Sequence, residues 1–177
     1  MKVDIVWFKR DFRLEDHAPI NEVATSNNNF LGIFVIEPSR LRENDTDPIH
    51  IDWEIQCAVE LQSRIRELGG EMLILHDEII DVFVKLSKEY QISNIYSHEE
   101  IGTEWSYKRD IQFGEWCKSR ELNWKEFPTN AVVRKLNNRD NWYKIRTERL
   151  MKDVIPAPNQ LKFENELRID SISSSKE

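Results

Sequence analysis

The chain has 177 residues, of which 40% are hydrophobic and 32% are charged, and its formal net charge is −7. This length suits one globular domain with a sizeable core. The acidic balance argues against a protein that binds polyanions over its whole surface, and no apolar stretch approaches the roughly 20 residues of a membrane-spanning helix.

The two cysteines, Cys57 and Cys117, lie far apart in the sequence and form no C-x-x-C pair. They predict neither a disulfide framework nor a metal site, and they fit a reducing compartment. The apolar run after Lys2 is too short for a signal peptide and ends in charges. We therefore expect a cytoplasmic protein with no membrane partner.

Five short apolar segments alternate with helical patterns along residues 3–127. Strands are predicted at 3–8, 30–36, 72–75, 93–97 and 122–127, and helices at 19–25, 51–68, 78–90 and 102–120. Strands that alternate with helices form right-handed βαβ units. We predict an α/β, Rossmann-like three-layer domain over residues 1–130, with a five-stranded parallel sheet of order 3-2-1-4-5.

Charged side chains follow the predicted strands where they end. Open α/β sheets bind ligands at the carboxyl ends of their strands, at the point where the strand order reverses. Here that point is a crevice between the first and fourth strands. The candidate binding residues at the strand ends are Phe8, Lys9, Arg10, Glu37, His98, Glu99 and Glu100.

These charges have alternative interpretations. Lys9 and Arg10 either join an ion-pair network that pins the following loop or face an anionic ligand. His98 is either a structural histidine or a ligand contact. Glu99 and Glu100 either accept hydrogen bonds from an amino-pyrimidine or amide edge, or form a solvated corner that caps the next helix.

The turn after the first strand contains no glycine. The G-x-G-x-x-G dinucleotide fingerprint and the P-loop are therefore absent, which argues against an NAD enzyme. The sequence shows no Ser/His/Asp or Cys/His arrangement and no metal-ligand spacing. We predict no catalytic residue and no metal in this chain.

The composition changes after Pro128. Residues 131–158 form a basic C-terminal extension around Trp142 and Tyr143, with a helix predicted from about Asn141. This extension either contacts nucleic acid through phosphate charge and stacking or docks onto another domain. Residues 159–177 contain few core formers and are predicted to be a linker or a disordered tail.

Three blocks of the sequence resemble the photolyase/cryptochrome family. The segment WFKRDFRLED (7–16) is similar to W-F-[KR]-[RQ]-D-L-R-x-x-D, and DHAP (16–19) to a form seen in the plant-cryptochrome-like, or class III, branch. SHEEIGTEWSYKRD (97–110) resembles that branch's S-H-[EQ]-E-T-G-x-x-W-[ST]-Y-x-R-D, and NAVVRKLNNRDNW (130–142) resembles N-G-V-V-R-R-L-x-x-R-D-x-W. Phe12, Ile101, Ala131 and Asn141 depart from these patterns.

The resemblance covers the N-terminal third of a typical family member, its α/β antenna domain. It implies an auxiliary chromophore, such as methenyltetrahydrofolate, a flavin or a deazaflavin, that passes excitation energy to FAD. FAD, the light-driven splitting of pyrimidine dimers by deoxyribodipyrimidine photolyase, and DNA binding would belong to a helical domain that is missing here, joined in cis or in trans. Alone, the chain is expected not to repair DNA.

Three other functions stay open. The segment 134–152 would make the chain an interaction module that docks onto a separate flavin domain. The same crevice would alternatively serve a small nucleotide-binding protein. The last alternative is a truncated product without activity.

Overall fold

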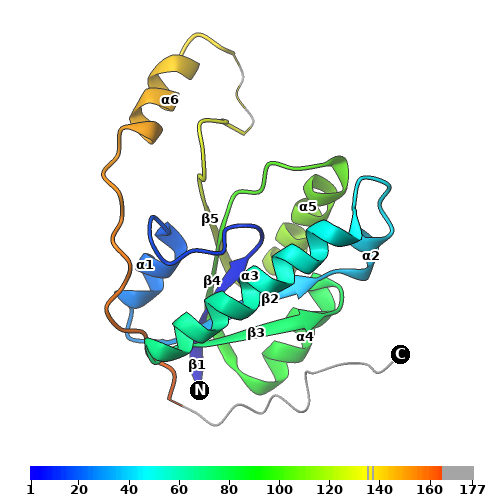
Figure 1. The fold of residues 1–177 in the computed structure, drawn as a ribbon, viewed down its shortest axis with the longest axis vertical. Helices are drawn as coiled ribbons and strands as arrows, with labels where there is room; N and C mark the ends of the chain where they lie inside the picture. Colours follow the sequence, from blue (N-terminus) through cyan, green and yellow to red (C-terminus); the bar gives the residue numbers. More distant parts are fainter. Residues whose placement is uncertain (135, 137, 165–177) are drawn as a thin grey trace.

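The computed structural model describes residues 1–134, 136 and 138–164. A five-stranded sheet lies at its centre, all neighbours are parallel, and the order β3-β2-β1-β4-β5 confirms the prediction. The strands are β1 (Lys2–Phe8), β2 (Asn29–Ile36), β3 (Glu71–His76), β4 (Gln91–His98) and β5 (Asn123–Phe127) (Figure 1).

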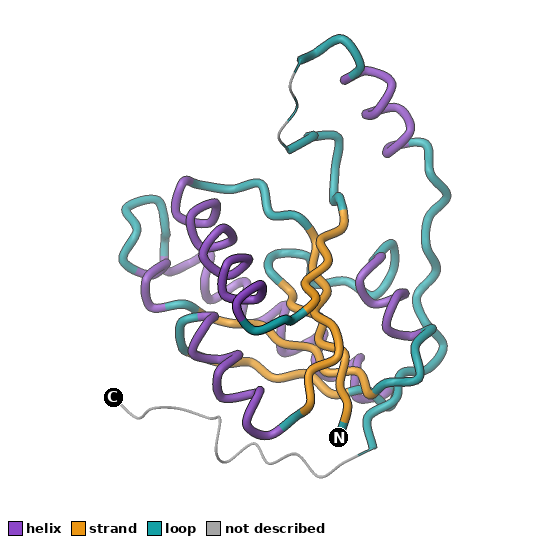
Figure 2. The backbone as a smooth tube through the Cα atoms, turned by 180° about the vertical axis from the view of Figure 1, so that it is seen from behind, coloured by secondary structure: helices purple, strands orange, loops and turns teal. Residues whose placement is uncertain are grey.

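The helices are α1 (Ala18–Ala24), α2 (Pro38–Leu41), α3 (Pro48–Glu67), α4 (Ile79–Glu89), α5 (Glu104–Ser119) and α6 (Trp142–Leu150). Helices α1 and α3 cover one face of the sheet, and α4 and α5 cover the other (Figures 1 and 2). Only α2 was not predicted, because four residues are too few to show a helical period. Within the described residues, no helix is long and apolar enough to cross a membrane.

The side chains of β1 alternate between two cores. Val3, Ile5 and Trp7 pack toward α4 and α5, whereas Val6 and Phe8 pack toward α1 and α3. Successive side chains of a strand point to opposite faces, and here both faces are covered. This explains why the opening strand reads as a continuous apolar run.

Residues 159–164 pack against the body, which corrects the prediction of a linker starting at 159. The amide of Leu161 donates to the carbonyl of Leu68, and the amide of Phe30 to that of Lys162, both at 2.7 Å. The Leu161 side chain is buried. Gly69 has a φ of +86°, and a Cβ there would meet the Leu161 carbonyl oxygen at 2.9 Å. One buried leucine leaves no periodic pattern, and residues 165–177 lie outside the described part.

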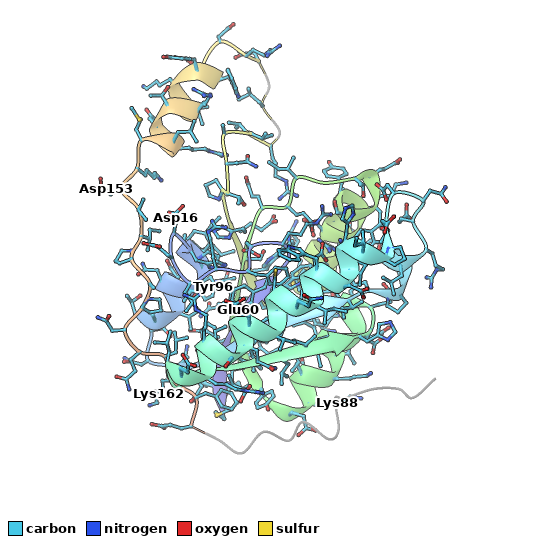
Figure 3. All side chains as sticks on the ribbon, in the orientation of Figure 1. Asp16, Glu60, Lys88, Tyr96, Asp153 and Lys162 are labelled. Carbon is cyan, nitrogen blue, oxygen red and sulfur yellow. The ribbon has the colours of Figure 1, made fainter. Side chains whose placement is uncertain are left out.

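Residues 128–158, here called the arm, carry α6 away from the sheet (Figures 1 and 2). The guanidinium of Arg149 donates to the carbonyl of Val132 at 2.7 Å. The amide of Asp16, labelled in Figure 3, donates to the carbonyl of Ile155 at 2.7 Å. The predicted basic extension is therefore bonded to the loop after β1 near its C-terminal end, and Arg149 bridges α6 to its start, while α6 has no buried residue. Lys135 of that extension lies outside the described residues.

Candidate functional site

Side chains fill the crevice between the carboxyl ends of β1 and β4. Lys9 Nζ lies 3.1 Å from Asp110 of α5 and 3.5 Å from Glu126 of β5, and both Lys9 and Asp110 are buried. The same ammonium lies 4.5 Å from the Trp7 ring centroid and 5.3 Å from that of Trp124. Lys9 therefore pairs with Asp110 and Glu126 and does not face Glu99 or Glu100 across a crevice, because the buried ammonium needs a partner.

Arg109 of α5 lies beside Lys9 and contacts three carboxylates. It donates to Glu37 at 3.0 Å, to Asp110 at 2.9 Å, and to Glu100. Burial acts to lower the pKa of Arg109, but Glu100, Asp110 and Glu37 outweigh burial and raise it above its usual value. Burial raises the pKa of Glu37, although Arg109 acts against it. The guanidinium thus stays charged and joins the ends of β2 and β4 to α5.

Arg10 is the one predicted cation that meets the acidic strand end. Its guanidinium lies 2.9 Å from Glu100 Oε1, and about half of its side chain is exposed. Arg13 donates to the backbone carbonyl of Asp16 at 2.9 Å. Asp16 has a φ of 51°, which Asp adopts more readily than most residues. The charges after β1 therefore form the ion-pair network, which was one of the two interpretations.

Asp11, His17 and His98 form a buried cluster on the other side of the β1 end. His98 Nδ1 and His17 Nε2 lie 2.6 Å and 2.9 Å from the same Asp11 oxygen, and the amide of Lys9 donates to the other oxygen at 2.9 Å. Burial acts to raise the pKa of Asp11, but its contacts with the two imidazoles outweigh burial and hold the pKa below its usual value. The cluster ties the loop after β1 to the end of β4.

The three ligand atoms of this cluster lie within 4.8 Å of one another, a spacing that metal sites share. However, His17 caps α1, and its Nδ1 accepts a hydrogen bond from the amide of Ile20 at 3.2 Å. A neutral imidazole that coordinates through Nε2 carries its proton on Nδ1, where this amide already points. We therefore interpret the cluster as an Asp11 carboxylate that hydrogen-bonds to His98 and the Lys9 amide, with His17 Nε2 in close contact. Burial lowers the pKa of His17, although Asp11 acts to raise it.

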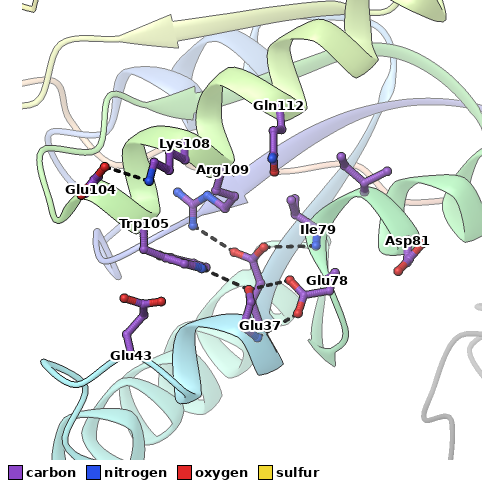
Figure 4. Close-up of a pocket in the computed structure, with 12 residues that line it drawn as sticks. Glu37, Glu43, Glu78, Ile79, Asp81, Glu104, Trp105, Lys108, Arg109 and Gln112 are labelled. Atoms are coloured by element: carbon purple, nitrogen blue, oxygen red, sulfur yellow. Dashed lines mark hydrogen bonds and ion pairs between the residues drawn. The ribbon is translucent and has the colours of Figure 1, made fainter.

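An open hollow lies beside the filled crevice, over the carboxyl ends of β2 and β3 (Figure 4). Its larger lobe has a volume of about 530 Å³ and its smaller lobe about 140 Å³, and Trp105 lines both lobes. We call the two lobes the Trp105 hollow. The larger lobe includes Glu37, Ser39, Glu78, Lys108 and Arg109, and the smaller one includes Arg10, Arg40 and His50. The size is that of a small-molecule site.

Trp105 is fixed at its edge and on its face. Its Nε1–H donates to Ser39 Oγ at 3.1 Å, and Ser39 Oγ–H donates to Glu78 at 2.7 Å. The Arg109 guanidinium lies 4.9 Å from the Trp105 ring centroid. Figure 4 shows the indole projecting from α5 toward α2. The hollow therefore has an aromatic wall whose orientation is set before any ligand binds.

The Trp105 hollow is acidic. Its carboxylates are Glu37, Glu43, Asp45, Glu54, Glu78, Asp81 and Glu104, whereas its cations are Arg10, Arg40, Lys108 and Arg109. Each cation already has an ion-pair partner: Arg40 lies 2.6 Å from Glu54, and Lys108 lies 2.7 Å from Glu104. The excess of carboxylates favours a neutral or cationic guest over one that carries phosphate.

A separate groove of about 900 Å³ lies on the other side of α5. Glu99 and Glu100 line it together with Ile101, Tyr107 and Trp124. Glu99 Oε2 makes no hydrogen bond with the described residues, and the nearest guanidinium, that of Arg149, is 3.8 Å away. The two adjacent carboxylates therefore do not act as one pair: Glu100 pairs with Arg10 and Arg109, whereas Glu99 makes only the longer contact with Arg149.

The seven predicted binding residues are thus distributed over three places. Arg10 and Glu37 line the Trp105 hollow, Glu99 and Glu100 line the groove, and Phe8, Lys9 and His98 are buried behind them. The residues that sequence reasoning did not select are Trp105, Arg109, Asp110, Ser39 and Glu78. The first three stand in the block that resembles the photolyase pattern, which could have indicated them. No motif marks Ser39 or Glu78.

The fold and the hollow define a doubly wound α/β domain with an open, ligand-sized site at the carboxyl edge of its sheet. Residues 4–147 match the DNA photolyase family, and the chain belongs to that family.

Two relatives illustrate the relationship. The deoxyribodipyrimidine photo-lyase of Synechococcus sp. is 25% identical over 97 residues, which are 55% of this chain and 20% of that protein. The cryptochrome DASH of Gloeobacter violaceus is 23% identical over 117 residues, which are 63% of this chain and 23% of that protein. The chain therefore matches about a fifth of the length of these relatives.

Solved structures share the fold at low sequence identity. A cryptochrome from Synechocystis superposes with a TM-score of 0.73 at 17% identity, over 98% of this chain and 41% of that one. A bacterial class III photolyase from Agrobacterium tumefaciens gives 0.75 at 14%, over 98% and 36%. An archaeal photolyase from Sulfolobus tokodaii, described as containing two FAD molecules, gives 0.71 at 19%, over 92% and 38%.

Proposed function

We propose that this chain is the light-harvesting domain of a photolyase or cryptochrome, and that the Trp105 hollow holds its auxiliary chromophore. The observation that carries the proposal is a ligand-sized hollow at the carboxyl edge of the sheet, walled by an indole fixed in place. Transfer of excitation energy needs a site that fixes a dye but needs no acid, base or nucleophile. The Sulfolobus photolyase, whose second FAD is described as implying a novel light-harvesting cofactor, has the same fold.

The charge of the hollow favours methenyltetrahydrofolate among the candidate chromophores. Its ring system carries a delocalised positive charge, which the surplus of carboxylates around Trp105 attracts, and its glutamate carboxylates would lie outside the hollow. Its amino-pyrimidine edge donates hydrogen bonds of the kind that Glu78 or Glu43 accept. FMN and FAD bring phosphates, for which the hollow offers only cations that are already paired.

The remaining steps belong to a larger assembly in this proposal. FAD, the splitting of pyrimidine dimers and the contact with DNA reside in a helical domain, supplied in cis or in trans. The described residues provide a site for the dye and a surface for that domain. We propose a cytoplasmic location, in keeping with two cysteines that form no disulfide.

A dye titration tests the chromophore site. The purified chain is mixed with 5,10-methenyltetrahydrofolate, FMN or FAD, passed through a desalting column, and examined for near-ultraviolet absorbance that stays with the protein. We expect folate to be retained. The W105A variant should bind folate about tenfold more weakly, the size of a lost stacking contact. The matched control is W53A, since Trp53 on α3 is 67% exposed and lies outside the hollow.

Two results would contradict the proposal. One is a chain that retains none of the three dyes at protein and dye concentrations near 100 μM, about the weakest affinity useful to a resident cofactor. The other is an equal loss of dye binding in W105A and W53A, which would show that the Trp105 hollow is not the binding site.

The arm supports a second function, docking onto an FAD-binding helical domain. Helix α6 has no buried residue, and Tyr143, Met151 and Val154 are 70%, 79% and 64% exposed. Exposed apolar side chains interspersed with cations, such as Lys144 and Arg146, are typical of an interface whose partner is acidic.

Co-purification tests this docking. A tagged FAD-binding helical domain from a class III photolyase is incubated with the chain, and the retained fraction is measured. The variant Y143D/M151D, or R146E, should lose retention, whereas I49D on the distant α3 should keep it. Equal retention by all variants would exclude the arm as the docking surface.

A further inference from the structure

Arg109 is placed between two indoles. The guanidinium carbon lies 4.9 Å from the ring centroid of Trp105 and 4.7 Å from that of Trp7. Trp7 is buried in the core between β1 and α5, whereas Trp105 forms the wall of the hollow. A planar cation that lies over both rings therefore connects the rigid core to the wall.

The guanidinium itself has almost no freedom to move. Its Nε–H donates to Asp110 at 3.1 Å, one terminal amine donates to Glu37 at 3.0 Å, and the other donates to Asp110 at 2.9 Å and to Glu100. Four of the five N–H groups of an arginine are thus used. These bonds come from the end of β2, the segment after β4 and the helix itself, so they fix the plane of the guanidinium relative to the sheet.

The edge of Trp105 is held by a separate, uncharged contact. Its Nε1–H donates to Ser39 Oγ at 3.1 Å, and Ser39 donates in turn to Glu78 at 2.7 Å. One contact restrains the tilt of the ring and the other its rotation. Since a ligand that stacks on a fixed ring loses less freedom than one that must first order it, such restraint increases affinity.

We propose that Arg109 is the positioning residue of the Trp105 hollow: although it also lines the larger lobe, it acts on a bound chromophore through the indole of Trp105. The inference rests on the proposed function and specifies how that site is organised. The planar shape of the guanidinium carries the effect, and its charge serves mainly to satisfy Glu37, Glu100 and Asp110. Lysine therefore supplies the charge at position 109 but not the stacking.

A double-mutant cycle on dye affinity separates this role from direct contact. Binding of 5,10-methenyltetrahydrofolate is measured for the wild-type chain, R109K, W105A and the double variant. We expect R109K to weaken binding about tenfold, the size of a desolvated cation–π contact. In the W105A background the same change should weaken binding less than about twofold, since effects that share one partner are not additive. An equal loss in both backgrounds would overturn the proposal, as would no loss in either.

Measurements on the dye-free chain keep the inference distinct from the proposed function. The Nε1–H signal of Trp105 in a ¹H–¹⁵N spectrum reports the order of the ring. R109K and S39A should each broaden it or speed its exchange with solvent, while the signal of Trp116, which stacks on the core residue Phe113, persists as a sign of an intact core. Unchanged Trp105 signals in both variants would refute the positioning role whether or not a dye binds. A wild-type chain that binds no dye but shows these changes would refute only the proposed function.

Discussion

The two sides of the sheet's carboxyl edge differ in how their charges are used. Between β1 and β4, Lys9 and Asp110 form a buried ion pair, and Arg109 lies beside them and pairs with Asp110 as well. Over β2 and β3, Trp105 borders an open hollow whose carboxylates outnumber its cations. Ligands of open α/β sheets usually bind where the strand order reverses, which here is between β1 and β4. In this chain the residues at that point join the strands to α5, and the ligand-sized cavity lies over β2 and β3 instead.

Charged side chains at the ends of these strands therefore have two different roles. A cation that is buried needs a partner, and a partner that reaches it from a helix closes the crevice. A carboxylate that lines the open hollow can still accept hydrogen bonds from a ligand. We therefore expect substitutions in the crevice to change stability and substitutions in the hollow to change binding.

The largest effect should come from Asp110→Ala. This change removes the carboxylate that Lys9 contacts at 3.1 Å and leaves a buried ammonium with only a longer contact to Glu126. Breaking a buried pair by removing one partner costs about 3–5 kcal/mol of unfolding free energy. Urea unfolding followed by circular dichroism measures it. E104Q, which alters the exposed Glu104–Lys108 pair, is the control and should leave the midpoint unchanged. A D110A chain as stable as the wild type would contradict the claim that the ion pairs between β1 and β4 stabilise the fold.

Leu161→Ala supplies a purely apolar reference for that loss. The side chain is buried against α3 and the turn at Gly69, at the opposite edge of the sheet from the site. Truncating a buried leucine costs about 2–4 kcal/mol. The same urea experiment applies, and dye binding at temperatures where the variant is folded should not change. A loss below about 1 kcal/mol would mean that residues 159–164 do not belong to the folded body.

The Asp11–His17–His98 cluster should make stability depend on pH. The folded-state pKa of His17 is lowered from 6.5 because burial disfavours the charged ring. The unfolded chain therefore takes up a proton more readily, and stability falls as the pH drops below about 6.5. One such group contributes a slope of at most about 1.4 kcal/mol per pH unit.

The variant His17→Asn tests this slope, since asparagine keeps an acceptor for the cap of α1 but does not titrate. Urea midpoints between pH 5 and 7.5 should vary less for H17N than for the wild type. H76Q, at the exposed end of β3, is the control and should retain the wild-type slope. Identical slopes in all three chains would contradict the assignment.

The smallest effect on stability is expected in the hollow itself. Trp105 is half-buried, and its removal loses one cation–π contact and one hydrogen bond. We expect W105A to cost about 1 kcal/mol in unfolding free energy, well below D110A, while reducing dye affinity. A loss of unfolding free energy as large as that of D110A would show that Trp105 is part of the core, and would contradict the separation of stability from binding.

Most of the fold could be predicted from the sequence, because the strands leave simple patterns. The continuous apolar runs of β1 and β2 indicate burial on both faces, and Gly69 correctly marks the end of α3. The features that were not predicted are short or isolated: the four-residue helix α2, and the burial of Leu161, a single side chain in a polar segment. Neither produces a period that a sequence pattern can reveal.

The candidate site was less predictable, because distant residues decide which charges stay free. Nothing near Lys9 in the sequence shows that Asp110, 101 positions later, pairs with it. The pattern placed Arg10 and Glu37 at strand ends, and both line the hollow. It could not show that Ser39 and Glu78 meet at the edge of Trp105, since that contact depends on how α2, α4 and α5 pack.

The most direct test of the central claim follows all six tryptophan indole signals during one titration. Unlabelled 5,10-methenyltetrahydrofolate is added to the ¹⁵N-labelled chain, with the Nε1–H signals assigned by single substitutions. We predict that the Trp105 signal shifts or broadens with dye concentration, while the signals of Trp7, beside Lys9, and of Trp124, in the groove, do not change. Movement of Trp124 with Trp105 unchanged would place the guest on the other side of α5 and contradict the account.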